Sequence, residues 1–249
     1  MKHPPGKVYD PPLRKPPPEL VEAFTQNGEL DLEFWYWNFK NYHHVTLFNK
    51  TFIDTLIKND KNKKMIGAYG HESAGLKELL QKYAAELNGK SGIVIGTQHP
   101  WVEVMLLNVG VNHVTTVDYN TITIEHPNIS VISVTNLAEK NLDGRFQPAD
   151  FAVSFSSIEH AGLGRYGDPL NPYGDLESAA QTWCMLKPGG LFFLGVPANF
   201  GKRKGKIRFN GDRIYGEARL EHLTANFLEL ERRPFEYDSI ITLRKPLSD

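Results

Sequence analysis

Polar side chains that could bind a ligand or move a proton follow three short apolar runs of the sequence. The three polar segments are Gly96-Thr97-Gln98, Asp118-Tyr119 and Ser156-Ser157-Ile158-Glu159-His160. In an open parallel sheet, ligands bind beyond the carboxyl ends of the strands, at the point where strand order reverses. If each apolar run is a strand, these segments meet at one edge. The sequence therefore predicts a single cleft lined by them.

The spacing within this cleft suits a nucleoside cofactor. Asp118 comes 22 residues after Gly96, a distance typical of a carboxylate that accepts hydrogen bonds from both ribose hydroxyls. Glycine at position 96 would let the backbone turn tightly and approach a ligand closely. Two structural alternatives stay open: Asp118 can be a turn or capping residue, and Gly96 can serve only a strand-to-helix turn.

Glu159, His160 and Asp168 are the candidates for positioning a substrate and for acid–base work. An unperturbed histidine titrates near neutrality, so His160 is the better candidate base. Glycines at 162, 164 and 167 would let the chain turn around a substrate, with Arg165 and Asp168 at its rim. We expect the segment Lys202–Arg213 to close over it as a loop. A helix-entry cap with a packed imidazole is the structural alternative for Glu159 and His160. Further acidic and histidine positions for a metal are lacking, so we predict no metal.

The elements that must position these residues form an alternating pattern after residue 90. Helical stretches separate near-continuous apolar runs, which is typical of a parallel sheet covered on both faces. The predicted strands are Gly92–Ile95, Val114–Val117, Ser130–Val134, Phe151–Phe155, Leu191–Val196, Phe227–Glu231 and Ser239–Leu243. The pattern predicts an α/β fold with a Rossmann-like, doubly wound, mostly parallel seven-stranded sheet. We expect Gly92–Ile95 inside the sheet and the last two strands antiparallel at an edge.

The chain divides by composition into an extension, residues 1–69, and an α/β domain, residues 70–249. Seven prolines lie within the first 18 residues, so this arm cannot form a helix interior or a central strand. The aromatic stretch Phe34–Phe39 that follows is too apolar for a solvent-facing helix. We expect it to pack on the domain, and stacking against a ligand is the alternative.

Composition excludes several classes of protein. The 249 residues have a formal net charge of -1, so no global field attracts nucleic acid, and we expect no nucleic-acid partner. The single cysteine, Cys184, excludes an internal disulfide, and we expect it to be a small buried side chain. No apolar run reaches the roughly 20 residues of a membrane span. We expect a cytoplasmic protein, and the sequence leaves its oligomeric state open.

Two motifs resemble known families. The turn Leu186-Lys187-Pro188-Gly189-Gly190 and the segment Ser157–His160 are similar to the class I S-adenosylmethionine-dependent methyltransferases. The longer run Ser157–Asp168, with Pro100–Glu103 and Val114–Asn120, resembles the family called domain of unknown function 268. The resemblance covers residues from about Gly70 to the C-terminus. It implies a methyltransferase-like fold and S-adenosylmethionine as cofactor. The residues it implies for the cofactor are Gly96, Thr97, Gln98, Asp118, Tyr119, Asn136, Ser156 and Ser157.

The cofactor loop departs from the class I pattern. That pattern places an acid two residues before the first glycine and then Gly-x-Gly-x-Gly, whereas this chain has Val94, Gln98 and Pro100. The glycines let the backbone approach the cofactor, so their loss weakens the expected binding. A methyltransferase of unknown acceptor, with a small molecule or a glycan left open, is our first hypothesis. A catalytically inactive methyltransferase fold that binds a partner is the second, and a nicotinamide-dependent oxidoreductase is the third.

Overall fold

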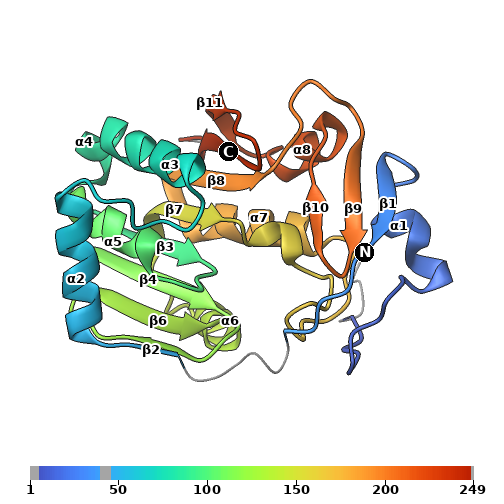
Figure 1. Ribbon diagram of the computed structural model, residues 1–249, viewed down its shortest axis with the longest axis horizontal. Helices are drawn as coiled ribbons and strands as arrows, with labels where there is room; N and C mark the ends of the chain where they lie inside the picture. The colour runs from blue at the N-terminus through green and yellow to red at the C-terminus, as the bar shows by residue number, and fades with distance from the viewer. Residues whose placement is uncertain (1–5, 40–45, 248–249) are drawn as a thin grey trace.

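The computed structural model describes residues 6–39 and 46–247 and has a seven-stranded sheet at its centre (Figure 1). The order of the strands across this sheet is β11-β12-β8-β7-β3-β4-β6. Their bounds are β3 (Ser91–Ile95), β4 (His113–Asp118), β6 (Ile129–Ser133), β7 (Ala149–Phe155), β8 (Leu186–Pro197), β11 (Leu228–Arg233) and β12 (Asp238–Arg244). Every strand predicted from an apolar run is present, and the predicted fold class is confirmed.

The direction of the strands also follows the prediction. Strands β3, β4, β6, β7 and β8 are mutually parallel, whereas β12 is antiparallel to both β8 and β11. The chain builds the sheet outward from β3, first through β4 to β6 and then through β7 to β8. The order therefore reverses between β3 and β7, and the carboxyl ends of these two strands mark the expected ligand crevice.

Alternate side chains of each strand pack into two separate cores. Val94 and Phe193 face a core with the helices α3 (His71–Lys82), α4 (Ala84–Leu87) and α5 (Trp101–Asn108). Their sequence neighbours Ile93 and Phe192 face the opposite core, with α7 (Gly174–Met185) and α8 (Glu217–Leu223). Successive side chains of a strand point to opposite faces, so strands that are apolar at every position bury both faces.

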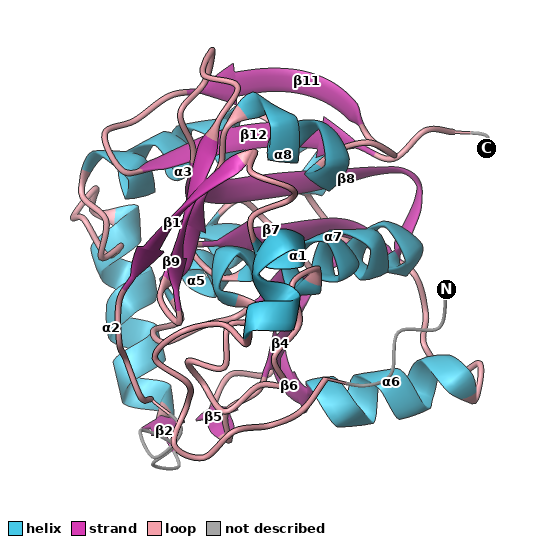
Figure 2. Ribbon diagram, turned by 90° about the vertical axis from the view of Figure 1, so that its right-hand side faces the viewer, coloured by secondary structure: helices cyan, strands magenta, loops and turns pink. Residues whose placement is uncertain are grey.

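The residues before Gly70 pack mainly on the carboxyl side of the sheet. Strand β1 (Leu30–Phe34) pairs in parallel with β9 (Gly205–Phe209), which forms an antiparallel hairpin with β10 (Asp212–Ile214). These three strands make a second sheet, visible at the right of Figure 1 and in front of the central sheet in Figure 2. The segment Lys202–Arg213 is thus mostly this hairpin, and the expectation of a loop is wrong.

Most of the remaining elements fall into two groups, one packed on the second sheet and one packed on α5. The short helices η1 (Pro18–Leu20) and α1 (Val21–Phe24) precede β1, and residues 6–17 contain no helix or strand. A two-stranded sheet joins β2 (Thr46–Phe48) to β5 (Ile122–Ile124), and α2 (Lys50–Lys61) packs on α5 through Ile53 and Val104. Helix α6 (Val134–Leu142) follows β6. The division at residue 70 stays a prediction.

Two expectations about exposure have different outcomes. Cys184 is exposed on α7, so the prediction of a buried thiol is wrong. The helix repeat places position 184 on the outer face, because the buried residues of α7 are Asp175, Ala179 and Thr182. Within residues 6–39 and 46–247, no helix has both the length and the apolar character to cross a bilayer. The cytoplasmic location stays a prediction.

Candidate functional site

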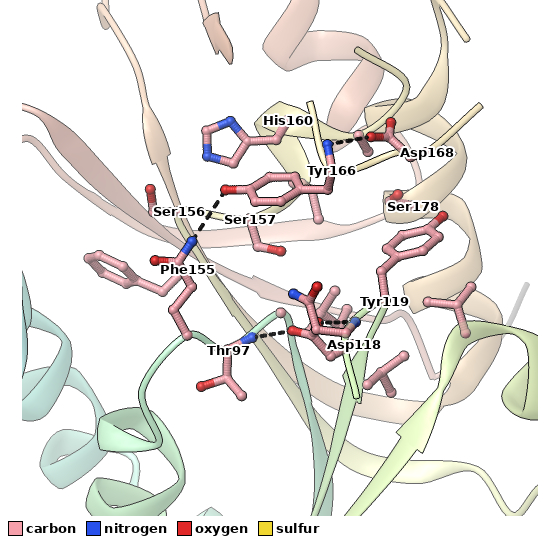
Figure 3. A pocket seen from close by; sticks show the side chains of 18 of the residues that line it. Thr97, Asp118, Tyr119, Phe155, Ser156, Ser157, His160, Tyr166, Asp168 and Ser178 are labelled. Carbon is pink, nitrogen blue, oxygen red and sulfur yellow. Dashed lines mark hydrogen bonds between the residues drawn. The ribbon is translucent and has the colours of Figure 1, made fainter. Parts of the chain in front are cut away.

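A cavity of about 640 Å³ lies at the carboxyl ends of β3, β4 and β7, where the strand order reverses (Figure 3). Most residues predicted for a ligand site line it. These are Gly96, Thr97, Gln98, Asp118, Tyr119, Ser156, Ser157, His160 and Asp168. Two predicted residues do not: Glu159 lies behind the wall, and Asn136 is exposed on α6, its N–H bonded to Ser133 Oγ at 3.2 Å.

The close approach of the loops after β3 and β7 requires a glycine at position 96. Its φ of +74° is in the left-handed region, and a Cβ at this position would lie 2.1 Å from the Ser157 hydroxyl. The Gly96 N–H donates to the Val117 carbonyl at 2.9 Å, which continues the β3–β4 pairing into the loop. The glycine therefore allows the loops after β3 and β7 to touch. The tight-turn interpretation accounts for this residue without any ligand.

Asp118 joins the end of β4 to the loop after β3. It is buried, and its Oδ2 accepts the Thr97 N–H at 2.8 Å, while its Oδ1 accepts the Asn120 N–H at 2.7 Å (Figure 3). Asp118 also lines the cavity, and a carboxylate oxygen has two lone pairs with which to accept hydrogen bonds. Asp118 thus orders the loop and can also accept hydroxyl groups from a ligand. Its neighbour Tyr119 lines the cavity and is 60% exposed.

The three departures from the methyltransferase loop have distinct places. Val94 is buried in the core of the sheet, so no acid could stand there without a large cost of desolvation. Pro100 is buried and directly precedes α5. Gln98 is exposed at the cavity, and its amide nitrogen lies 3.4 Å from the Tyr166 hydroxyl, in the loop after β7. The Gln98 side chain therefore spans the cavity mouth, where a second glycine would leave it open.

Ser156 has an unusual backbone that directs the loop after β7. Its φ is 48°, rare for a residue with a side chain, and such conformations cluster at functional sites. The Ser156 N–H donates to the Gly195 carbonyl at 3.0 Å, and its hydroxyl donates to Glu159 Oε1 at 2.9 Å. The turn at Ser156 thus sends the next residues across the end of the sheet and buries the Glu159 side chain beneath them.

Glu159 is completely buried and is held in its neutral form. Burial, and next the nearby Asp238 carboxylate, raise the pKa of Glu159 well above its usual value. Burial likewise raises the pKa of Asp238 to about 6. Among the described residues, Glu159 Oε2 has no hydrogen-bond partner. A neutral carboxyl group behind the wall can support the cavity but does not touch a ligand in it.

His160 lines the cavity as a neutral imidazole. Its Nδ1 lies 2.8 Å from the Gly211 carbonyl oxygen, which only accepts, so Nδ1 carries the hydrogen and Nε2 is the acceptor. Nε2 faces Glu159 Oε1 at 3.4 Å. Burial, and next the guanidinium of Arg165, lower the pKa of His160 to about 4. The imidazole is therefore neutral near pH 7, and its contact with Glu159 is not an ion pair.

Asp168 closes the glycine-rich turn after β7. Its Oδ2 accepts the N–H groups of Gly162 and Gly164 at 2.8 and 3.2 Å, and its Oδ1 accepts that of Tyr166 at 3.2 Å (Figure 3). Burial raises the pKa of Asp168, and these backbone donors oppose the rise. Three backbone bonds to one carboxylate indicate a residue that shapes the turn rather than one available for proton transfer.

Several residues at the site were not predicted from the sequence. Trp35 and Trp37 line the cavity from the segment after β1, which agrees with the ligand-stacking alternative for the aromatic stretch. Asp212 lines it from the hairpin that was expected to be a loop. Arg213 is completely buried behind it and donates to the carbonyls of Glu159 and Ala161 at 3.1 and 2.7 Å. No sequence motif indicated the roles of Asp212 and Arg213.

The titratable side chains around the cavity do not form a metal site. Among residues 6–39 and 46–247, no group of three or more histidine, cysteine or acidic side chains is arranged to hold a metal ion. The cavity acids are instead engaged by protein donors. Asp118 and Asp168 accept backbone N–H groups, and Asp212 pairs with the Arg208 guanidinium.

Comparison with solved structures finds methyltransferase folds. An O-methyltransferase family protein from Burkholderia thailandensis has a TM-score of 0.51 at 9% identity, covering 80% of this chain and 59% of that one. The 1,6-didemethyltoxoflavin-N1-methyltransferase of the same organism, solved with S-adenosylhomocysteine, has a TM-score of 0.47 at 17% identity, covering 73% and 92%. The N-methyltransferase NodS of Bradyrhizobium japonicum, in complex with S-adenosylhomocysteine, has a TM-score of 0.49 at 16% identity, covering 78% and 96%. At these identities the likeness shows the fold alone.

Comparison at the level of sequence gives the family. A search of the curated proteins finds no match. Residues 89–243 match the family model described as "Caenorhabditis protein of unknown function, DUF268". The matched segment spans β3 to β12, and so includes the whole central sheet and the loops that form the cavity. This match covers more than half of the sequence, and the chain therefore belongs to the DUF268 family.

Proposed function

We propose that this protein is an S-adenosylmethionine-dependent methyltransferase. The observation that carries the proposal is the position of Asp118, a carboxylate at the end of β4 that faces a cavity at the reversal of strand order. Ligands of doubly wound sheets bind at this place, and a carboxylate there suits ribose hydroxyls. The volume of about 640 Å³ lies within the usual range for pockets that enclose a whole small molecule.

The residues present fit this cofactor. The Asp118 carboxylate lines the cavity where it would accept the ribose hydroxyls, and the exposed ring of Tyr119 offers a face for the adenine. The backbone of Gly96 and Thr97, with the Gln98 side chain, would hold the amino-acid part beside Ser156 and Ser157. When bound, the cofactor supplies a methyl group on a positively charged sulfur. The protein then has to bind, orient and exclude water, because alignment is the chief requirement of this transfer.

The residues after β7 define what kind of acceptor the site can use. General bases work best when their pKa is near the operating pH, and the pKa of His160, at about 4, is far below it. We propose that His160 contacts the acceptor but does not need to deprotonate it. Glu159 and Asp168 are positioning residues that hold His160 and the glycine-rich turn. Such a site favours an acceptor atom that is already nucleophilic at neutral pH.

Calorimetric titration of the purified protein tests the proposal. S-Adenosylmethionine and S-adenosylhomocysteine should each bind at one site, whereas NAD should not bind, because Gln98 and Trp101 occupy two positions where a dinucleotide loop needs glycine. The absence of binding at millimolar S-adenosylhomocysteine would contradict the proposal. That result would leave a methyltransferase fold whose cavity serves another ligand or a partner.

A further inference from the structure

Arg165 projects a guanidinium into the cavity from the glycine-rich turn. Its carbonyl accepts the Phe39 N–H at 2.9 Å, which ties the turn to the segment after β1. The guanidinium lies over three aromatic rings, with its carbon 5.6 Å from the centre of Trp37, 4.8 Å from Phe39 and 5.2 Å from Tyr166. Cation–π contacts on the faces of a guanidinium leave its N–H edge free to donate. The rings thus hold Arg165 in place without using its donors.

The donors of Arg165 are poorly satisfied within the protein. Nη1 lies 3.4 Å from the Gly211 carbonyl and 3.3 Å from His160 Nδ1, which itself carries a hydrogen. Nε is buried and has no partner among the described residues. Among residues 6–39 and 46–247, no carboxylate forms an ion pair with Arg165. A buried donor without a partner is costly, and such groups in native proteins call for an explanation such as a ligand that is not part of the chain.

None of the described acids that line the cavity forms an ion pair with Arg165, and each has other hydrogen-bond partners. Asp118 and Asp168 accept backbone N–H groups, and Asp212 binds the guanidinium of Arg208 through both oxygens. Arg208 lies over Trp35, with its carbon 4.0 Å from the ring centre, in an arrangement like that of Arg165 but with a carboxylate partner. Among the described residues, Arg165 is therefore the permanent cation of the cavity wall that lacks an anion.

We propose that Arg165 binds an oxyanion, a carboxylate or a phosphate, carried by the methyl acceptor. Guanidinium groups bind such anions through two parallel hydrogen bonds, which fix orientation as well as charge. Trp35 and Trp37 line the same cavity and remain 41% and 42% exposed, so they offer an apolar surface to the rest of the acceptor. The acceptor class is a small molecule with an apolar or ring body and one anionic group. This inference rests on the proposed methyltransferase function.

A matched pair of fluorinated probes tests this anion site. Protein saturated with S-adenosylhomocysteine is titrated with 4-fluorobenzoate and with 4-fluorobenzamide, its uncharged analogue, and binding is followed by fluorine NMR. The benzoate should bind at least about tenfold more tightly, since hydrogen bonds to charged groups are worth that much. Phenyl phosphate should compete with it if the site accepts both kinds of oxyanion, and failure to compete would restrict the site to carboxylates.

Three variants give the test its specificity. Arg165→Gln should abolish the preference for the benzoate, and Arg165→Lys, which keeps the charge without the planar fork, should retain part of it. Arg14→Gln is the control, because Arg14 also lies over a ring, 3.9 Å from the centre of Tyr36, but is exposed and outside the cavity lining. It should behave as the wild type. Equal binding of both probes to the wild type, or an unchanged preference in Arg165→Gln, overturns the proposal.

The cofactor has a carboxylate of its own, and a second titration separates the two sources. If Arg165 binds the acceptor, Arg165→Gln should change the affinity for S-adenosylhomocysteine less than about threefold. A tenfold loss for S-adenosylhomocysteine, with no loss for 5′-methylthioadenosine, which lacks the amino-acid part, would assign Arg165 to the cofactor and overturn the proposal. If S-adenosylhomocysteine does not bind the wild type, the proposed function fails, and the same probe preference in cofactor-free protein decides whether Arg165 is an anion site.

Discussion

Asp118 combines a structural and a ligand-binding role in one side chain. Replacing it with alanine removes the acceptor for the ribose and releases the Thr97 N–H. Hydrogen bonds to charged groups contribute about 1.5 to 3 kcal/mol each, so Asp118→Ala should lower the affinity for S-adenosylhomocysteine at least tenfold by calorimetry. Asp31→Ala, at an exposed position on β1, is the control. Equal affinity in Asp118→Ala and the wild type would show that Asp118 only shapes the turn.

The buried carboxyl group of Glu103 should make the free energy of unfolding depend on pH. Its side chain on α5 is completely buried, accepts the Thr116 hydroxyl at 2.8 Å, and has its pKa raised by burial to about 7. Between pH 4.5 and 7 the folded chain keeps a proton that the unfolded chain has lost, so this group makes the protein less stable as pH rises. Relative to the wild type, Glu103→Gln should gain on the order of 3 kcal/mol across this window.

Urea unfolding at a series of pH values measures this difference. Glu139→Gln, at an exposed position on α6, is the control and should follow the wild type at every pH. A difference between Glu103→Gln and the wild type that stays constant from pH 4 to 8 would show that the pKa of Glu103 is the same in the folded and the unfolded chain. The buried carboxyl group would then need a partner beyond Thr116.

The sequence predicted which residues gather at the cavity but not how each side chain points. The position of a polar segment after a strand is visible in the sequence, which is why Asp118 and His160 both line the cavity. The direction of Glu159 depends on the left-handed backbone of Ser156, and a serine gives no sequence signal for this conformation. Arg165 was predicted at the rim of the acceptor site for a different reason, the flexibility of the neighbouring glycines.

At the scale of elements, Arg213 of β10 fixes the segment that follows β7. Its guanidinium donates to the carbonyls of Glu159 and Ala161 and lies 3.5 Å from the Asp175 carboxylate of α7. Arg213→Met would leave these buried acceptors unpaired, so the free energy of unfolding should fall by about 3 kcal/mol or more, measured with urea. Arg145→Met, which breaks an exposed ion pair, should change it by less than about 1 kcal/mol.

An unchanged stability in Arg213→Met would contradict this account of the segment. It would mean that water or a rearranged loop replaces the guanidinium at the carbonyls. The cavity should change as well, because Glu159 is the neighbour of His160 and its backbone is held by Arg213. We therefore expect a parallel loss of affinity for S-adenosylhomocysteine in Arg213→Met but not in Arg145→Met.

The strands of the central sheet were predictable, whereas the second sheet was not. A run that is apolar at every position indicates a buried parallel strand, and β3, β7 and β8 have such runs. Residues Lys206–Phe209 of β9 alternate polar and apolar side chains, a sign of a strand buried on one face. The basic residues Lys202, Arg203 and Lys204 directly before this strand favoured the interpretation of the segment as a loop instead. The partner strand β1 lies 175 residues earlier, and pairing over such a distance leaves no local signal.

At the scale of the whole molecule, the N-terminal extension completes both a core and the cavity. Phe24 is completely buried and packs edge-on against Phe209 of β9, with ring centres 5.3 Å apart. Phe24→Ala should lower the free energy of unfolding by about 3 to 5 kcal/mol in urea and should speed hydrogen exchange in β9 and β10. Phe34→Ala, at a position that is 51% exposed on β1, should have little effect.

This result would also bear on function, since the cavity wall contains Trp35 and Trp37 from the same extension. If the extension only shields the sheet, Phe24→Ala would affect stability and leave ligand affinity intact. If it completes the site, as the cavity lining indicates, the preference for 4-fluorobenzoate should weaken in Phe24→Ala. Unchanged stability and exchange in this variant would contradict the packing of the extension on β9.

A crystal structure of the protein grown with S-adenosylhomocysteine tests the central claim most directly. We expect density for one molecule in the cavity between the ends of β3, β4 and β7, with its ribose hydroxyls bonded to Asp118 and its amino-acid part along Gly96 and Thr97. The sulfur should then face His160 and the Arg165 side of the cavity. A cavity without density at millimolar ligand, or a ligand bound elsewhere on the chain, would contradict the account.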